Sequence, residues 1–310
     1  ALLNSCPECT RLRCCTLRMS ESGTTIQGPV LRPSLPAEPT QFDSSCVANP
    51  VVLPPSVTGS SKWQCYYYGN AGNWADGNKG FLPTGWIGLA ESDDGIHWTK
   101  VPGKEEMGSI LAPTGNPADW DGIHIGVGDV VRVSESELHM YYFGGSGEGG
   151  LFSFLFGGAL KGLRMRIGRA RSTDGGRTWE RMGMVLDYDK SEGKFASWPR
   201  IMLPEPGETK PWKMVYHSFN GNQWSAFGAT SRDEGKTWTR DGLLLGPGKS
   251  DSWDDSGVGT RAVARTKNGD WVMVYEAVGG GKLGPFSGKH RLGVARLVQS
   301  GEAGTWKWER

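Results

Sequence analysis

The chain has 310 residues and is rich in glycine (47), proline (18) and tryptophan (14). Almost no stretch keeps an apolar period of 3.6 residues, which excludes a helical protein and favours an all-β fold. The formal net charge is +1, with acidic and basic residues interspersed, so no nucleic acid or anionic membrane is expected as a partner. No apolar run approaches the length of a transmembrane segment.

The N-terminal residues 1–19 differ in composition from the rest. Four of the six cysteines lie there, namely Cys6, Cys9, Cys14 and Cys15, together with several arginines and few acids. This spacing lacks the histidine or second well-spaced pair of a usual zinc site. The composition is compatible with the end of a leader to an organelle such as the plastid, or with part of a folded unit. We therefore expect a soluble protein and leave its compartment open.

A short turn with serine or threonine, aspartate, glycine and tryptophan recurs at 92–98, 172–179 and 231–238; we call these the repeat turns. The aspartate can accept hydrogen bonds from the main chain of its own turn, and the glycine can adopt positive φ. The tryptophan begins the next strand and can pack on a neighbouring unit. A degenerate copy of the repeat turn lies at 301–306 and ends at Trp306. Such self-similarity predicts a repeat architecture.

Four units surround these turns with the same order of parts. Each has a Gly/Val-rich inner strand, an aromatic second strand and a third strand. The inner runs are 47–52, 127–131, 195–201 and 258–263, the second runs 63–68, 138–143, 212–217 and 271–276, and the third runs 86–90, 167–171, 226–230 and 292–296. The composition and spacing predict four-stranded antiparallel blades of a β-propeller.

A further unit is predicted at the N-terminus. Residues 20–26 keep the register of the first repeat turn, and 28–31 parallel the outer-strand sequences at 108–111, 183–186 and 242–245. We therefore expect a five-bladed β-propeller with four clear blades and a degenerate N-terminal one. Residues 20–310 would form one domain, and residues 1–19 a leader or partial blade.

The candidate site follows from propeller geometry, because inner-strand starts and the loops between second and third strands meet at one end of the central channel. The inner strands supply Asn49, Asp129, Ser197, Trp198, Arg200, Thr260 and Arg261, and the second strands and loops supply Trp74, His217, Trp224 and Glu276. Aromatic rings beside amides and charges suit a sugar. The alternative is that the loops are ordinary turns and the tryptophans pack between blades.

The repeated Ala/Ser-x-Ser-x-Asp-Gly-x-x-Trp unit resembles the five-bladed glycoside hydrolases of the arabinanase, xylosidase, invertase and levansucrase superfamily (families 43 and 32), over roughly residues 20–310. The second and third repeat turns also resemble the Asp-box of six-bladed sialidases. The first resemblance implies three inner-strand acids, because glycoside cleavage needs a proton donor and a base or nucleophile. These acids would fall at Asn49, Asp129 and Ser197, so one of three matches.

The two mismatches bear on activity. An amide at Asn49 cannot accept a proton from water, and a hydroxyl at Ser197 cannot act as a glycosidic acid near neutral pH. The family mechanism therefore requires a substitute acid, and the candidates are Glu276, Asp76, Asp121, Asp254 and Asp43. We expect a carbohydrate in the channel, take Asp129 and Glu276 as candidate catalytic residues, and leave open whether the protein is an enzyme. A sialidase-like alternative would use Arg200 and Arg261.

Partners and cofactors are less constrained. The apolar run 151–156 lies in a long loop between second and third strands. It either folds back on its blade or docks a protein partner, in which case the propeller would be a non-catalytic subunit of a larger assembly. The five histidines show no metal-ligand spacing, so no metal residue and no cofactor are assigned. The resemblance is compatible with a single cation in the central channel.

Overall fold

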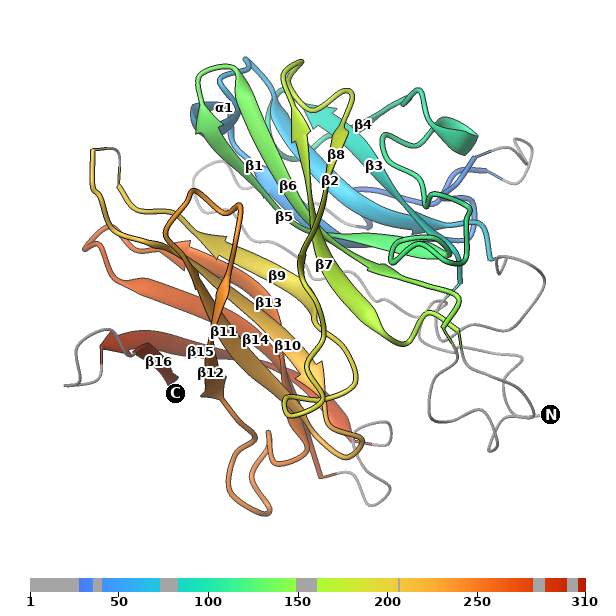
Figure 1. Cartoon of the computed structure of the whole chain (residues 1–310). Coiled ribbons are helices and arrows are strands. Elements are labelled where there is room, and N and C mark those ends of the chain that lie inside the picture. The colour runs from blue at the N-terminus through green and yellow to red at the C-terminus, as the bar shows by residue number, and fades with distance from the viewer. Residues whose placement is uncertain are drawn as a thin grey trace.

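The computed structural model describes residues 28–35, 41–72, 83–148, 161–205, 207–280, 288–299 and 306–310. Strands dominate these residues (Figure 1). They are β1 (Cys46–Leu53), β2 (Trp63–Asn70), β3 (Gly85–Ser92), β4 (Thr99–Val101), β5 (His124–Ser134), β6 (Glu137–Gly145), β7 (Met165–Ser172), β8 (Glu180–Leu186), β9 (Ser197–Met202), β10 (Trp212–Phe219), β11 (Trp224–Ser231), β12 (Thr239–Leu245), β13 (Gly257–Arg265), β14 (Trp271–Gly279), β15 (Lys289–Gln299) and β16 (Trp306–Glu309). Short helical turns are α1 (Pro55–Thr58) and η2 (Glu106–Gly108).

The strands form antiparallel units in chain order. β1 to β4 and β5 to β8 are separate four-stranded sheets. β9 to β12 and β13 to β16 are two further four-stranded units, joined by one parallel pairing of Trp224 with Gly257. The predicted all-β propeller fold with four-stranded antiparallel units is confirmed. The predicted N-terminal unit falls mostly outside the described residues.

Figure 1 shows the units following one another from blue through green and yellow to red, and the first strands of consecutive units, β1, β5, β9 and β13, contact each other in that order. The apolar core lies between neighbouring units. Tyr66 and Leu89 of the first unit share one buried cluster with Val130 and Met140 of the second. Two further clusters join the second unit to the third and the third to the fourth. Burial between units therefore supplies most of the hydrophobic stabilisation.

A polar triad recurs in every unit. A buried acid before the first strand accepts a hydrogen bond from a second-strand tyrosine and pairs with a Lys or Arg on or just after the outermost strand. The triads are Asp43–Tyr67–Lys100, Asp121–Tyr142–Arg181, Glu192–Tyr216–Arg240 and Asp254–Tyr275–Arg310. Because each buried carboxylate has both a donor and a countercharge, its desolvation is offset within the unit.

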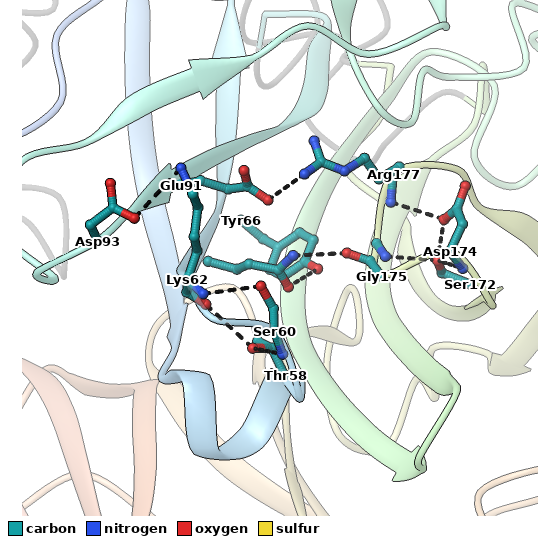
Figure 2. A network of polar contacts seen from close by, with 12 residues as sticks. Thr58, Ser60, Lys62, Tyr66, Glu91, Asp93, Ser172, Asp174, Gly175 and Arg177 are labelled. Carbon is teal, nitrogen blue, oxygen red and sulfur yellow. Dashed lines mark hydrogen bonds and ion pairs between the residues drawn. The ribbon is translucent and has the colours of Figure 1, made fainter.

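The second and third repeat turns each fasten their unit to the preceding one, as Figure 2 shows for the second turn. Gln64 of β2 donates to the carbonyl of Gly175 (2.8 Å), and Tyr66 donates to Gln64 (2.9 Å). Arg177 of the same turn pairs with Glu91 of the first unit (2.6 Å). One unit later, the Tyr141 hydroxyl lies 3.3 Å from the carbonyl of Gly235 in the third repeat turn. The repeat turns are thus part of the scaffold.

The aspartates of the repeat turns make the hydrogen bonds that the sequence predicts. One carboxylate oxygen of Asp174 accepts the main-chain N–H groups of Arg177 and Thr178, each at 3.0 Å. Asp233 does the same in the third turn. The hydrogen bond from the Thr237 hydroxyl and those from the main chain lower the pKa of its carboxyl to about 2. The carboxylates stay ionised and keep the turns closed near neutral pH.

No helix among the described residues has the length and hydropathy needed to cross a membrane.

Candidate functional site

The inner strands share one irregularity, which sets the candidate site. Each of β1, β5, β9 and β13 breaks register with its second strand, and the residues released from regular pairing include Asn49, Gly128, Trp198 and Arg261. Asn49 and Trp198 have φ of 50° and 49°, a left-handed conformation that is strained for residues with a Cβ. Bulges re-aim side chains. Predicted site residues of all four inner strands therefore lie at or next to bulges.

The register separates the three positions that the resemblance assigns to acids. Ser197 pairs with His217 before the bulge of β9, and Asp129 pairs with Tyr141 after the bulge of β5. Asn49 lies inside the bulge of β1. Ser197 is fully buried, whereas Asp129 and Asn49 are partly buried. The three residues therefore occupy different positions relative to the bulges of their strands: before, after and inside.

Asp129 joins two inner strands. One carboxylate oxygen accepts the N–H of Val130 (2.9 Å), and the other accepts the N–H of Ile201 in β9 (2.8 Å). The neighbouring Arg200 is buried and donates to the carbonyl of Gly128. Burial raises the pKa of Asp129 above its usual value, against the opposing effects of Arg200 and the two N–H groups. A raised pKa suits a proton donor, but both oxygens are engaged by the main chain.

Arg261, Glu276 and His290 form a charged cluster on β13, β14 and β15. One Glu276 oxygen pairs with the Arg261 guanidinium, and the other contacts Nδ1 of His290. The three side chains are 35%, 22% and 46% exposed, so the cluster is open to solvent. Partial burial of the Arg261 side chain and the nearby charge of Arg200 lower the pKa of Arg261 to about 10, so it remains cationic near neutral pH. The cluster presents fixed donors and an anionic acceptor.

The aromatic side of the site is built around His217. Its Nδ1 accepts the N–H of Thr260 (3.0 Å), which places the ring proton on Nε2. Burial lowers its pKa well below the usual value, so the ring is neutral. The Thr260 hydroxyl donates to the carbonyl of Trp198 (2.7 Å), and the Trp198 ring stacks on His217 at 4.9 Å and packs on Phe143 at 4.3 Å. Trp224 meets the edge of His217 at 5.4 Å. We call this packed cluster of His217, Thr260, Trp198, Phe143 and Trp224 the His217 wall.

Three buried polar atoms of β9 make no hydrogen bond within the described part of the chain: Ser197 Oγ, Trp198 Nε1 and Arg200 Nε. A buried polar group without a partner costs about 1–3 kcal/mol. All three atoms are enclosed by their neighbours, so this cost is borne by the packing of the inner strands.

The loop acids considered as substitutes have other roles. Asp43, Asp121 and Asp254 are buried and belong to the triads, so they are scaffold residues and not free catalytic acids. Asp76, Trp74 and the apolar run 151–156 lie outside the described residues. Of these acids that the structure describes, Glu276 is the one placed in an open cluster beside the inner strands.

The described residues include no group of three or more His, Cys, Asp or Glu side chains arranged to hold a metal ion. A cavity of ≈ 920 Å³ borders the third repeat turn and includes none of the predicted site residues. It is lined by side chains of both signs, among them Lys210, which pairs with Glu208 at 2.8 Å.

No protein-family model and no curated protein sequence matches the chain. Solved structures match it in fold. The β-1,2-mannobiose phosphorylase of Listeria innocua, in complex with β-1,2-mannobiose, has a TM-score of 0.55 and 13% identity over 80% of this chain and 71% of that chain. An endo-1,4-β-xylanase of Bacteroides thetaiotaomicron has a TM-score of 0.57 and 13% identity over 87% and 78%. A protein from a study of mannoside phosphorylases and hydrolases that target β-1,2-mannosidic linkages in Candida mannan has a TM-score of 0.55 and 19% identity over 82% and 67%.

These neighbours show that the chain has the fold of glycoside-hydrolase-like propellers. At such identities the likeness is one of fold, and it does not select the arabinanase and invertase group among such propellers. Substrate and chemistry must be argued from the site.

Proposed function

We propose that this protein binds a carbohydrate at the axial end of the inner strands. The observation that carries the proposal is the open Arg261–Glu276–His290 cluster beside the His217 wall. Sugar hydroxyls need fixed donors and acceptors, and a cationic guanidinium next to an anionic carboxylate supplies both. The fold supports the proposal, because solved structures with this fold include a β-1,2-mannobiose phosphorylase and an endo-1,4-β-xylanase.

Binding without cleavage is the form of the proposal that the residues support best. Glycoside hydrolysis by the usual route needs two carboxyl groups flanking the bond. Asn49 and Ser197 stand at two of the positions where the family resemblance expects acids, and both oxygens of Asp129 accept main-chain N–H groups. Glu276 is paired on both of its oxygens. It would therefore orient a sugar hydroxyl instead of donating a proton.

A sialidase-like function gains less support. Its carboxylate clamp would need free guanidinium groups. Arg200 is buried and donates to the carbonyl of Gly128, and Arg261 is paired with Glu276.

We expect Arg261→Met and Glu276→Gln each to weaken glycan binding about tenfold or more, because a hydrogen bond to a charged group contributes about 1.5–3 kcal/mol. The measurement is calorimetric titration of the full chain with β-1,2-mannobiose, or with the strongest ligand from a glycan array. Lys210→Gln is the matched control, since Lys210 is a surface ion-pair residue beside the distant cavity. Thermal melts establish that each variant is folded. Equal affinity in all four proteins would contradict the proposal.

A further inference from the structure

The cavity of ≈ 920 Å³ is enclosed by the third and fourth units, which Figure 1 draws in yellow to red. Residues of β9 to β12 and of their connections form one wall, and Asp270, Trp271 and Leu297 belong to the other. Small-molecule sites have volumes of about 300–1,000 Å³, so this cavity can hold a ligand of that class. It shares no residue with the candidate sugar site. Lys213 in its wall precedes His217 by four residues of β10, a separation of about 13 Å.

One wall contains a row of side chains that crosses the third unit. Lys213 of β10 lies opposite Met202 of β9 and Thr230 of β11, and Thr230 lies opposite Thr239 of β12. Directly opposed residues of neighbouring strands place their side chains on the same face of a sheet. The Lys213 ammonium lies 4.3 Å from the centre of the Trp306 ring in the fourth unit. The row therefore faces the fourth unit, and all four of its residues line the cavity.

Lys213 differs from its counterparts in the first two units, which also stand three residues before the triad tyrosine. In the first unit, Gln64 donates to a carbonyl of the second repeat turn (2.8 Å). In the second unit, His139 contacts Glu137 (2.6 Å). Lys213 forms no ion pair with a carboxylate of the described residues, and its ammonium faces the ring of Trp306. The third unit thus places an unpaired cation where the first two units place a paired polar group.

A second unpaired cation, Arg232, lies near Lys213 on the same wall. Arg232 is exposed, lines the cavity, and makes no hydrogen bond or ion pair through its side chain in the part of the chain that the structure describes. Burial lowers the pKa of the Lys213 ammonium; the charge of Asp241 opposes this effect, and the charge of Arg232 adds to it. Two like charges at one place favour an anion between them.

Most other charges of the cavity are already paired. One oxygen of Asp241 accepts a hydrogen bond from the Thr230 hydroxyl (2.6 Å) and one from Nε1 of Trp306 (2.8 Å). Asp233 closes its own repeat turn. The remaining pairs are Lys210 with Glu208 and Arg265 with Glu205. Asp270, on the opposite wall, is exposed, and its carboxylate has no partner among the described residues. The unpaired charges are therefore two cations on one wall and one carboxylate on the other.

The cavity also offers an apolar surface. Met202 belongs to the buried cluster between the third and fourth units, and Trp271 and Leu297 pack on that cluster. All three line the cavity. Trp271 and Leu297 are only partly buried, so part of their apolar surface is open. A ligand with an apolar ring or chain would remove this surface from water, which favours binding.

We propose that this cavity binds a small organic carboxylate, with its anionic group between Lys213 and Arg232 and its apolar part on Trp271 and Leu297. A guanidinium can donate two parallel N–H groups to a carboxylate, and an ammonium adds a second positive charge. The proposal does not depend on carbohydrate binding, because the two sites share no residue and are tested with different ligands.

The test is titration of the ¹⁵N-labelled full chain with 3-phenylpropionate, followed by NMR through the indole N–H signal of Trp271. The Trp271→Phe variant assigns that signal. We expect a saturable shift with a dissociation constant of about 1 mM or lower. The neutral 3-phenylpropionamide, which lacks the charge, and acetate, which lacks the apolar part, are each expected to bind at least about tenfold more weakly. Arg232→Gln and Lys213→Met are each expected to weaken binding of 3-phenylpropionate about tenfold or more.

Lys236→Gln is the matched control, because Lys236 is an exposed residue of the same repeat turn that does not line the cavity. It is expected to bind 3-phenylpropionate like the wild-type chain. Thermal melts establish folding, and the exposed Arg232 provides a variant that tests the proposal even if Lys213→Met is unstable. The proposal is overturned by the absence of a saturable shift up to about 10 mM probe. Equal affinity for the acid and either comparison ligand, or equal weakening by Arg232→Gln and Lys236→Gln, would overturn it too.

Discussion

Replacing Asp121 with asparagine is expected to lower the free energy of unfolding by about 3 kcal/mol. Asp121 is 2% exposed, accepts a hydrogen bond from Tyr142 (2.9 Å) and pairs with Arg181 (3.1 Å). Removing its charge leaves the guanidinium without its countercharge. The effect stays at the lower end of the range for a broken buried pair because a third of the Arg181 side chain is exposed. Urea denaturation measures it.

The matched control is Asp93→Asn. Asp93 is 83% exposed and lies 3.6 Å from Lys62, a geometry in which a surface ion pair contributes about 0–1 kcal/mol. The account therefore requires a clear gap between the two variants. If Asp121→Asn were as mild as Asp93→Asn, the triad would not stabilise its unit.

Alanine at Gly176 is expected to destabilise the protein by roughly 2 kcal/mol more than alanine at Gly175. Both glycines have positive φ, of 85° and 73°, so both variants pay the penalty of about 1–2 kcal/mol for a Cβ in the left-handed region. Only the Cβ at Gly176 collides, lying 1.9 Å from the hydroxyl of the fully buried Tyr66, whereas the Cβ at Gly175 meets nothing within 4 Å. The difference between the variants isolates the packing of the second repeat turn on the first unit.

Parallel urea titrations of the two variants give this difference directly. Equal loss of stability would show that Tyr66 can move aside, and that the turn contacts in Figure 2 do not fix the spacing between units.

The sequence predicted the units well because their signals are local. The repeat turns lie between the third and outer strands as expected, and each predicted inner, second and third run lies in or overlaps a strand. Two outer runs differ. Residues 28–31 form no strand, and 108–111 begins in the helical turn η2, with Leu111 making an isolated bridge to Ile87. Met107 there has φ of 55°, which breaks an extended strand.

The site was less predictable because it depends on side-chain contacts between strands that are separated in the sequence. The sequence placed Asp43, Asp121 and Asp254 among candidate acids, yet each is neutralised by a residue of the outer part of its own unit. A signal was present, since a tyrosine recurs at one place in every second strand and a Lys or Arg follows the repeat-turn tryptophan in three units. The bulges and the pairing of His290 with Glu276 left no comparable mark in the sequence, because ladder register and contacts between β14 and β15 set them.

The measurement that tests the carbohydrate site most directly is a glycan-array screen of the full chain beside its Glu276→Gln variant. Thermal melts first establish that both proteins are folded. We predict that the wild-type chain binds a defined set of glycans, and that the variant loses this binding while keeping its melting temperature within a few degrees. Binding to no glycan by the folded wild-type chain, or an unchanged pattern in the variant, would contradict a sugar site formed by Arg261, Glu276 and His290.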